Sequence, residues 1–139
     1  EPIARAMYEI SHNVDVEQVG FVVHHTIQMT GASPDGLIGE DGLIEIKCPT
    51  SATHIDYLLA GVVPAQYKNQ MLWQMECTGR KWCDFVSYDP RMPENMQMFC
   101  IRFERDDEEL NKIREDVIKF LSEVNEVIEK LQIISQGRK

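Results

Sequence analysis

One stretch of the sequence, residues 31–49, constrains the fold more than any other. It reads as a strand that ends near Asp35, a glycine-rich turn, and a second strand over residues 42–47. Polar and apolar residues alternate in the second strand, so we expect Glu45 and Lys47 to point to the same face. The hairpin returns Asp35 toward them. The sequence therefore predicts a pair of carboxylates and an ammonium group at one point of a short hairpin.

This constellation is typical of a divalent-metal site for phosphodiester hydrolysis, because Mg²⁺ prefers hard oxygen ligands and an amine can act on the attacking water. Near such cations we expect the pKa of Lys47 to be lowered. Simpler interpretations exist, since Pro34-Asp35-Gly36 is a turn signature and Glu45 with Lys47 resembles a surface charge pair. The apolar neighbours favour a buried hairpin, in which unpaired charges are costly; they are Leu37, Ile38, Leu43, Ile44 and Ile46.

The composition indicates one ordinary globular domain of 139 residues, 43% hydrophobic and 27% charged. No apolar run approaches the ~20 residues of a membrane span. The net charge of −9 argues against a broad basic surface for nucleic acid, but it is compatible with a local basic groove. The cysteines lack a Cys-x-x-Cys pair, so we expect reduced thiols in strands and helices; they are Cys48, Cys77, Cys83 and Cys100.

The first half of the chain predicts a helix over residues 1–10, with one apolar face formed by Ile3, Met7 and Ile10. Because this helix starts at the first residue, we expect that an N-terminal portion of the domain is missing. Residues 14–24 have a β-like pattern, and residues 26–30 are expected to continue into the strand that carries Asp35. His24 and His25 could be ligands, but we expect them on the surface of that strand, facing opposite ways.

The second half predicts helices over residues 52–60 and 64–78, ended by glycines, and paired strands over 82–88 and 95–104. A final helix follows a cap at Asp106 or Asp107. Its apolar residues have helical spacing: Leu110, Ile113, Val117, Phe120, Leu121, Val124, Val127, Ile128 and Leu131. The order α-β-β-β-α-α-β-β-α predicts an α/β layered fold with a mixed sheet.

Several motifs resemble those of a known family. Pro34-Asp35 followed by Glu45-Ile46-Lys47 is similar to the PD-(D/E)xK nuclease signature. With the longer stretches around it, the chain resembles the lambda-type phage alkaline exonucleases, which are YqaJ-like viral recombinase nucleases. The stretches that carry this resemblance are Glu1-x-x-Ala-Arg-Ala-x-Tyr-Glu9, Ser33-Pro-Asp-Gly-Leu37, Gly42-Leu-x-Glu-x-Lys-Cys-Pro49, Tyr67-x-x-Gln70 and Tyr88-Asp-Pro-Arg91.

The resemblance implies a restriction-endonuclease-like core, that is, a mixed central β-sheet flanked by α-helices, in a single nuclease domain over residues 1–139. It implies that Asp35, Glu45 and the Ile46 carbonyl bind Mg²⁺ or Mn²⁺. Two such ions would supply the charge that phosphodiester cleavage needs. By the same resemblance, Lys47 acts on the attacking water. Two further residues match family positions near the metal and the scissile phosphate, namely Glu1 and Gln70.

The resemblance also implies a function. It implies 5′→3′ hydrolysis of double-stranded DNA in the bacterial cytoplasm, by a phage or prophage enzyme, with 5′-mononucleotides and 3′ single-stranded tails as products. A single-strand annealing protein would be the partner in DNA recombination, and the assembly would be a ring-shaped homotrimer. Such a ring would gather cations around DNA; the candidates are Lys68, Arg80, Lys81, Arg91, Arg102 and Arg105.

Three other interpretations remain open from the sequence. One is a RecB- or Cas4-like iron–sulfur nuclease, which the scattered cysteines disfavour. Another is a restriction-type endonuclease. The third is a catalytically silent module for DNA binding or assembly, which the joint presence of Asp35, Glu45 and Lys47 disfavours.

Overall fold

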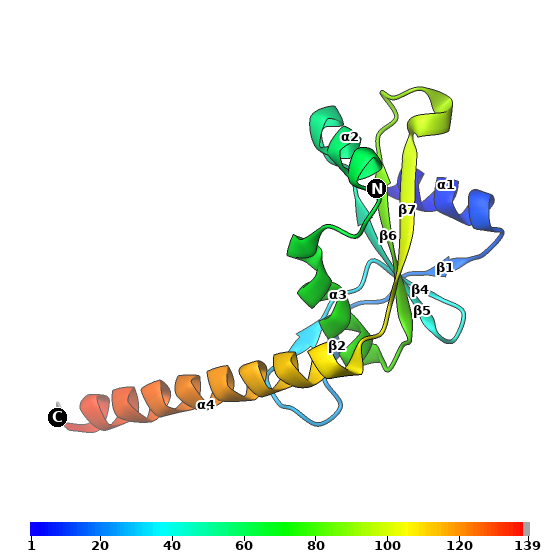
Figure 1. Cartoon of the computed structure of the whole chain (residues 1–139). Helices are drawn as coiled ribbons and strands as arrows, with labels where there is room; N and C mark the ends of the chain where they lie inside the picture. Colours follow the sequence, from blue (N-terminus) through cyan, green and yellow to red (C-terminus); the bar gives the residue numbers. More distant parts are fainter. Residues whose placement is uncertain (138–139) are drawn as a thin grey trace.

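A mixed β-sheet lies between helices on its two faces, as predicted (Figure 1). The structure is a computed structural model that describes residues 1–137. Its 5-stranded sheet has the order β1-β4-β5-β6-β7, in which only β5 and β6 are parallel neighbours. The strands are β1 (Val16–Glu17), β4 (Gly36–Ile38), β5 (Gly42–Lys47), β6 (Trp82–Tyr88) and β7 (Met98–Glu104).

The helices divide between the two faces of this sheet (Figure 1). They are α1 (Pro2–His12), α2 (Ser51–Ala60), α3 (Ala65–Thr78) and α4 (Asp107–Gly137), with a 3-10 turn at Glu94–Met96. Because β5 and β6 are parallel, their connection must cross the sheet, and α2 and α3 form this crossover. A separate 2-stranded sheet, β2 (Val22–Val23) with β3 (Gly31–Ala32), packs beside α3.

Alternation along β5 sends its side chains into two separate cores. Leu43 joins the core under α3, with Met71, Met75, Phe85 and Leu110. Ile44 and Ile46 join the core under α1. Glu45 therefore faces α3, the side that its spacing from Leu43 requires. None of the helices in residues 1–137 is long and apolar enough to cross a membrane.

The predicted buried face of α1 is wrong. Ile3 and Ile10 are 67% and 75% exposed, whereas Ala4 and Tyr8 are buried. The reason is a long-range polar contact: the Tyr8 hydroxyl donates to Asp84 Oδ2 on β6 at 2.5 Å. That bond turns the Tyr8 face of the helix toward the sheet, so Ile3 and Ile10, on a neighbouring face, point to solvent.

The predicted strand over residues 26–30 is also wrong, because this segment forms a loop. The His24 ring explains the loop, since its Nδ1 accepts from the Thr26 and Ile27 backbone amides at 3.1 and 2.9 Å. Met29 then has a positive φ of 64°, which a strand cannot accommodate. Nor is His24 a surface residue. It is buried, and its ring stacks on His25 and Trp73.

The boundaries of the later elements are close to those predicted. Thr50 caps α2, Gly61 and Gly79 end α2 and α3, and Asp106 Oδ1 accepts from the Glu109 amide at the start of α4. The last strand begins at Met98 rather than residue 95, because the 3-10 turn takes up the residues before it.

Glu76 on α3 is a buried carboxylate that joins three elements. It accepts from Arg105, which follows β7, and from Arg114 on α4. His24 Nε2 lies 3.4 Å from its Oε2, without hydrogen-bond alignment. The pKa of Glu76 is lowered to about 2, mainly by the hydrogen bond from Arg114 and in part by His24, against the opposing effect of burial. The Glu76 carboxylate therefore holds the N-terminal part of α4 against α3.

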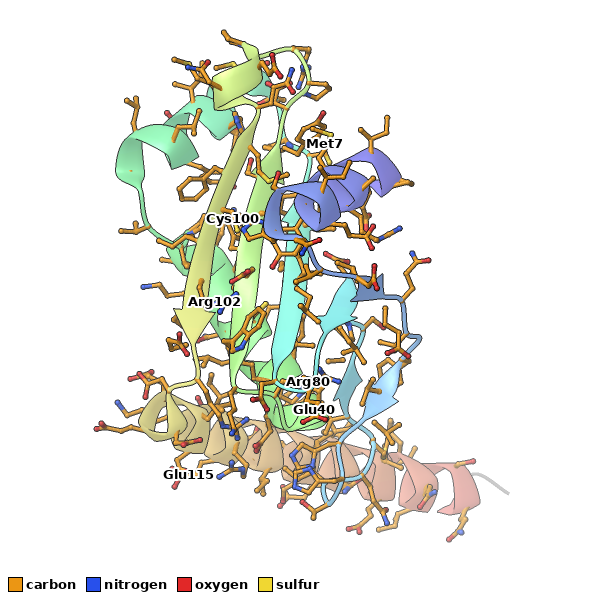
Figure 2. All side chains as sticks on the ribbon, turned by 90° about the vertical axis from the view of Figure 1, so that its right-hand side faces the viewer. Met7, Glu40, Arg80, Cys100, Arg102 and Glu115 are labelled. Atoms are coloured by element: carbon orange, nitrogen blue, oxygen red, sulfur yellow. The ribbon has the colours of Figure 1, made fainter. Side chains whose placement is uncertain are left out.

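We predict that Glu76→Gln lowers the free energy of unfolding by up to about 3 kcal/mol at neutral pH. A carboxylate with a lowered folded-state pKa stabilises the fold above its unfolded pKa, and this contribution is lost as pH falls toward about 2. The stability gap between the two proteins, measured by denaturant unfolding, should therefore close on acidification. The control is Glu115→Gln, since Glu115 is exposed on α4 (Figure 2). A gap that does not change with pH would contradict this account.

Candidate active site

The carboxylates of Asp35 and Glu45 meet because of strand register. In the β4–β5 hairpin Gly36 is opposite Ile44, so the residues one step outward, Asp35 and Glu45, are neighbours. Asp35 thus lies at the start of β4, rather than at the end of the strand before it. Its Oδ2 accepts from the Ile46 amide at 2.7 Å, which fixes the carboxylate against β5.

Glu45 is only 2% exposed and is held from two elements. Lys47 Nζ lies 3.2 Å from its Oε1, and Gln74 Nε2 on α3 donates to its Oε2 at 2.9 Å. Gln70 Nε2, one helical turn earlier, lies 3.4 Å from Oε1. A buried carboxylate needs such partners, because an unpaired charge there is strongly unfavourable. The structure therefore brings together Asp35, Glu45, Lys47 and Gln70.

The charge on Asp35 is poorly compensated within the protein. The pKa of Asp35 is raised to about 6, mainly by burial; the hydrogen bond from the Ile46 amide opposes this rise, and the negative charges of Glu45 and Glu1 add to it. Glu1 is therefore close enough to affect the site through its charge. Its Oε1 also lies 3.6 Å from Arg5 Nη2. This cluster of acids would be stabilised by a cation.

Lys47 is held as an ammonium group. Burial alone would lower its pKa, but the ion pair and hydrogen bond with Glu45 raise the pKa above its usual value. The lowering that the sequence predicted requires cations at the carboxylates, and the carboxylates alone have the opposite effect. Lys47 Nζ also lies 4.8 Å from the centre of the Tyr67 ring, which stacks on Phe85. Tyr67 therefore packs in the core and forms one wall beside Lys47.

The residues present fit a hard divalent cation. The donor set is made of carboxylate oxygens, which Mg²⁺ and Mn²⁺ prefer, and the acids repel one another without a cation. Gln74 is a further indication of a cation site, because its Oε1 is buried without a partner among the residues that the structure describes. Gln74 was not among the site residues predicted from the sequence. Its spacing of four residues from Gln70 on a helix was the signal that could have identified it.

A buried brace supports the segment that follows Lys47. Asp89, fully buried after β6, accepts from the Ser51 hydroxyl at 2.5 Å and from Arg91 Nε at 2.8 Å. Arg91 in turn donates to the Pro49 carbonyl at 3.0 Å. The Tyr88-Asp-Pro-Arg91 motif therefore fixes the turn between Lys47 and α2. The sequence marked this motif but gave no role for Asp89.

A second group of metal-ligating side chains lies on the opposite face of the sheet. His12, Asp84 and Cys100 come within 4.8 Å of one another (Figure 2 shows Cys100 on β7). Asp84 is already occupied, because Arg102 donates to both of its oxygens and Tyr8 to one. Burial raises the pKa of the Cys100 thiol to about 12, so the thiol stays protonated. The hydrogen bonds of Asp84 therefore give this group a role in stabilising the fold. The candidate metal site is the one formed by Asp35 and Glu45.

Three of the six cations expected around DNA already have partners within the fold. Arg102 stacks on Trp82 and binds Asp84 on the α1 side of the sheet, the face away from Glu45 (Figure 2). Arg80 donates to backbone carbonyls of the β4–β5 turn, and Arg105 binds Glu76 and Asp107. These three arginines serve the fold. The other three candidates have exposed side chains, although Arg91 also binds Asp89; they are Lys68, Lys81 and Arg91.

Comparison with solved structures identifies the class of fold. An alkaline exonuclease (LHK-Exo) from Laribacter hongkongensis superposes with a TM-score of 0.97 and 49% sequence identity, covering 99% of this chain and 71% of that one. Its complex with dAMP gives a TM-score of 0.96 at the same identity and coverage. A phage-related exonuclease from Haemophilus somnus 129PT, 16% identical, shares the fold with a TM-score of 0.60 over 88% of this chain and 69% of that one.

The mixed sheet, its flanking helices and these neighbours define the fold as that of the PD-(D/E)xK nucleases. Residues 1–81 match the YqaJ-like viral recombinase domain. The chain therefore belongs to the YqaJ-like viral recombinase family, as its motifs suggested. A search of curated proteins found no match.

We predict that Asp89→Ala loosens the turn between Lys47 and α2. Without this carboxylate the Ser51 hydroxyl and Arg91 lose their common acceptor, so the first turn of α2 should open more often. Hydrogen exchange of the amides of residues 51–55 should become at least about tenfold faster, while β6 and β7 keep their protection. The matched control is Asp56→Ala, an exposed residue of the same helix. Unchanged exchange in residues 51–55 would show that Asp89 does not hold this turn.

Proposed function

We propose that residues 1–139 form a single nuclease domain that degrades double-stranded DNA from its ends, as an exonuclease of phage recombination. The observation that carries this proposal is the convergence of Asp35, Glu45, Lys47 and Gln70 where β4 and β5 meet α3. Family membership supports it, and so does the 49% identity to a protein described as an alkaline exonuclease.

The proposed metal ligands are Asp35, Glu45 and the Ile46 carbonyl, with Glu1 at the edge of the site. They would hold Mg²⁺ or Mn²⁺, and two ions suit the reaction best. When bound, such ions stabilise negative charge on the phosphate and make a bound water more acidic. The chain itself supplies the placement: the Ile46 amide fixes Asp35, while Gln74 and Lys47 fix Glu45. Their geometry holds the carboxylates in place before substrate arrives.

Lys47 and Gln70 are the groups that would touch the reacting phosphate and water. The Lys47 ammonium can donate a hydrogen bond to the attacking water or to a phosphate oxygen. Gln70 binds Glu45 loosely at 3.4 Å, so its amide can turn to the scissile phosphate. In the reaction the water oxygen bonds to phosphorus, the bond from phosphorus to the 3′ oxygen breaks, and the leaving 3′ oxygen takes up a proton. The products are a 3′ hydroxyl and a 5′ phosphate.

Several finer features belong to the same proposal. Digestion runs 5′→3′, releases 5′-mononucleotides and leaves 3′ single-stranded tails. A single-strand annealing protein receives these tails in the cytoplasm of a bacterial host. The active assembly is a homotrimeric ring, which gathers the exposed cations Lys68, Lys81 and Arg91 around DNA despite the net charge of −9.

We predict that the protein digests linear duplex DNA labelled at one 5′ end, that digestion requires Mg²⁺ or Mn²⁺, and that covalently closed circles are left intact. In the same assay Lys47→Ala should reduce the rate by ~10²–10⁴, with little change in duplex affinity, because Lys47 acts on the water. Lys112→Ala, an exposed lysine on α4, is the matched control.

Three results would each refute part of this account. Cutting of closed circles would indicate an endonuclease. Digestion in the presence of a chelator would remove the metal from the mechanism. If Lys47→Ala lost duplex binding but kept its rate once bound, Lys47 would be a phosphate anchor rather than a group that acts on the water.

A further inference from the structure

The outer part of α4 carries an apolar surface that the rest of the described chain does not cover. At its root Leu110 is fully buried against α3. Farther along, the helix projects away from the sheet (Figure 1), and Phe120, Val127 and Leu131 are 62%, 54% and 58% exposed. Exposed side chains of this size and in this number on one helix are typical of an interface.

The spacing of these residues specifies what kind of surface it is. Apolar side chains recur alternately three and four residues apart along α4: Leu110, Ile113, Val117, Phe120, Val124, Val127, Leu131 and Ile134. This is a heptad repeat with a mean period of 3.5 residues, the pattern by which one helix packs along another. We call these eight residues the α4 seam. Only its first turn is used inside the fold.

The surface of the α4 seam is hollowed at its middle, between side chains of the helix itself. A shallow hollow there is lined by Phe120, Glu123, Val124, Val127 and Ile128. The first four of these stand at positions i, i+3, i+4 and i+7, which form the hole for one knob in a coiled coil. On another side of the helix, Ile27 and Gln28 border a separate hollow with Ile118 and Ser122, so that loop leaves the centre of the seam open.

We propose that the α4 seam pairs with the same seam of a second copy of this chain, with the two helices antiparallel. In this register Val124 lies opposite the partner's Val127, and Phe120 opposite the partner's Leu131. Val117 then faces the partner's Ile134. Two-fold symmetry repeats each contact, so the exposed part of the seam is buried in both copies.

Charge decides in favour of this register. Glu123 precedes Val124, and Lys130 follows Val127 by three residues. Antiparallel pairing therefore sets Glu123 beside the partner's Lys130, and symmetry makes this opposite-charge contact twice. In a parallel pair, Glu123 would instead lie beside the partner's Ile128, and the acidic Asp116 beside the partner's Leu121. The antiparallel arrangement also aligns the helix dipoles favourably. Because α4 projects away from the sheet (Figure 1), this pairing would put the sheets of the two copies at opposite ends.

Light scattering of the 139-residue protein over about 1–100 µM tests the pairing. Val124→Glu places two charges at the centre of the interface and should raise the dissociation constant at least ~100-fold, which halves the particle mass at a matched concentration. Ile133→Glu is the matched control, because Ile133 is 68% exposed and lies outside the α4 seam. The halving is expected whether or not the sheets also form a ring.

A charge exchange tests the orientation. Glu123→Lys and Lys130→Glu should each weaken association by about 3–10-fold, and the double variant should restore it, because the opposite charges meet again. Circular dichroism at the assay concentrations confirms that each variant is folded. The proposal is overturned if the protein is monomeric throughout, if folded Val124→Glu keeps the mass of the unchanged protein, or if the double variant associates no better than the singles.

Discussion

The buried Glu45 carboxylate is the interaction on which the site and much of the fold depend. It lies in the middle of β5 at 2% exposure, where an unpaired charge could not persist. Gln74 and Gln70 come to it from α3, and Lys47 from its own strand. The contact that makes the carboxylate tolerable therefore also fixes α3 to the sheet. The same contacts therefore hold α3 against the sheet and position the candidate ligand Glu45.

Topology determines which residues can take part. Parallel pairing of β5 and β6 requires a crossover, and the crossover lays α3 over the face to which Glu45 points. Antiparallel pairing of β4 and β5 then puts Asp35 beside Glu45. On the far side of the sheet, Tyr8 and Asp84 set the rotation of α1, the helix that carries Glu1 at its start. Strand pairing therefore positions Asp35 and Glu45, whereas the rotation of α1 positions Glu1.

Much of this arrangement was predictable from the sequence, because it follows from local patterns. Alternation predicted β5 and its two faces, and glycines predicted the ends of α2 and α3. The features that could not be predicted depend on contacts between residues distant in sequence, or on the hydrogen bonds of one side chain such as the His24 imidazole. The Tyr8–Asp84 bond overrode the apolar face of α1, and the His24 ring turned an apparent strand into a loop. Helical spacing in α4 likewise could not tell a buried face from an exposed one.

The central claim is that Asp35 and Glu45 together form a divalent-metal site, and calorimetric titration with Mg²⁺ or Mn²⁺ tests it most directly. The unchanged protein should bind the ion, and Asp35→Ala and Glu45→Ala should each lose that binding while unfolding cooperatively. Asp56→Ala, exposed on α2, should bind normally. Metal affinity that persists unchanged in both carboxylate variants would contradict the account.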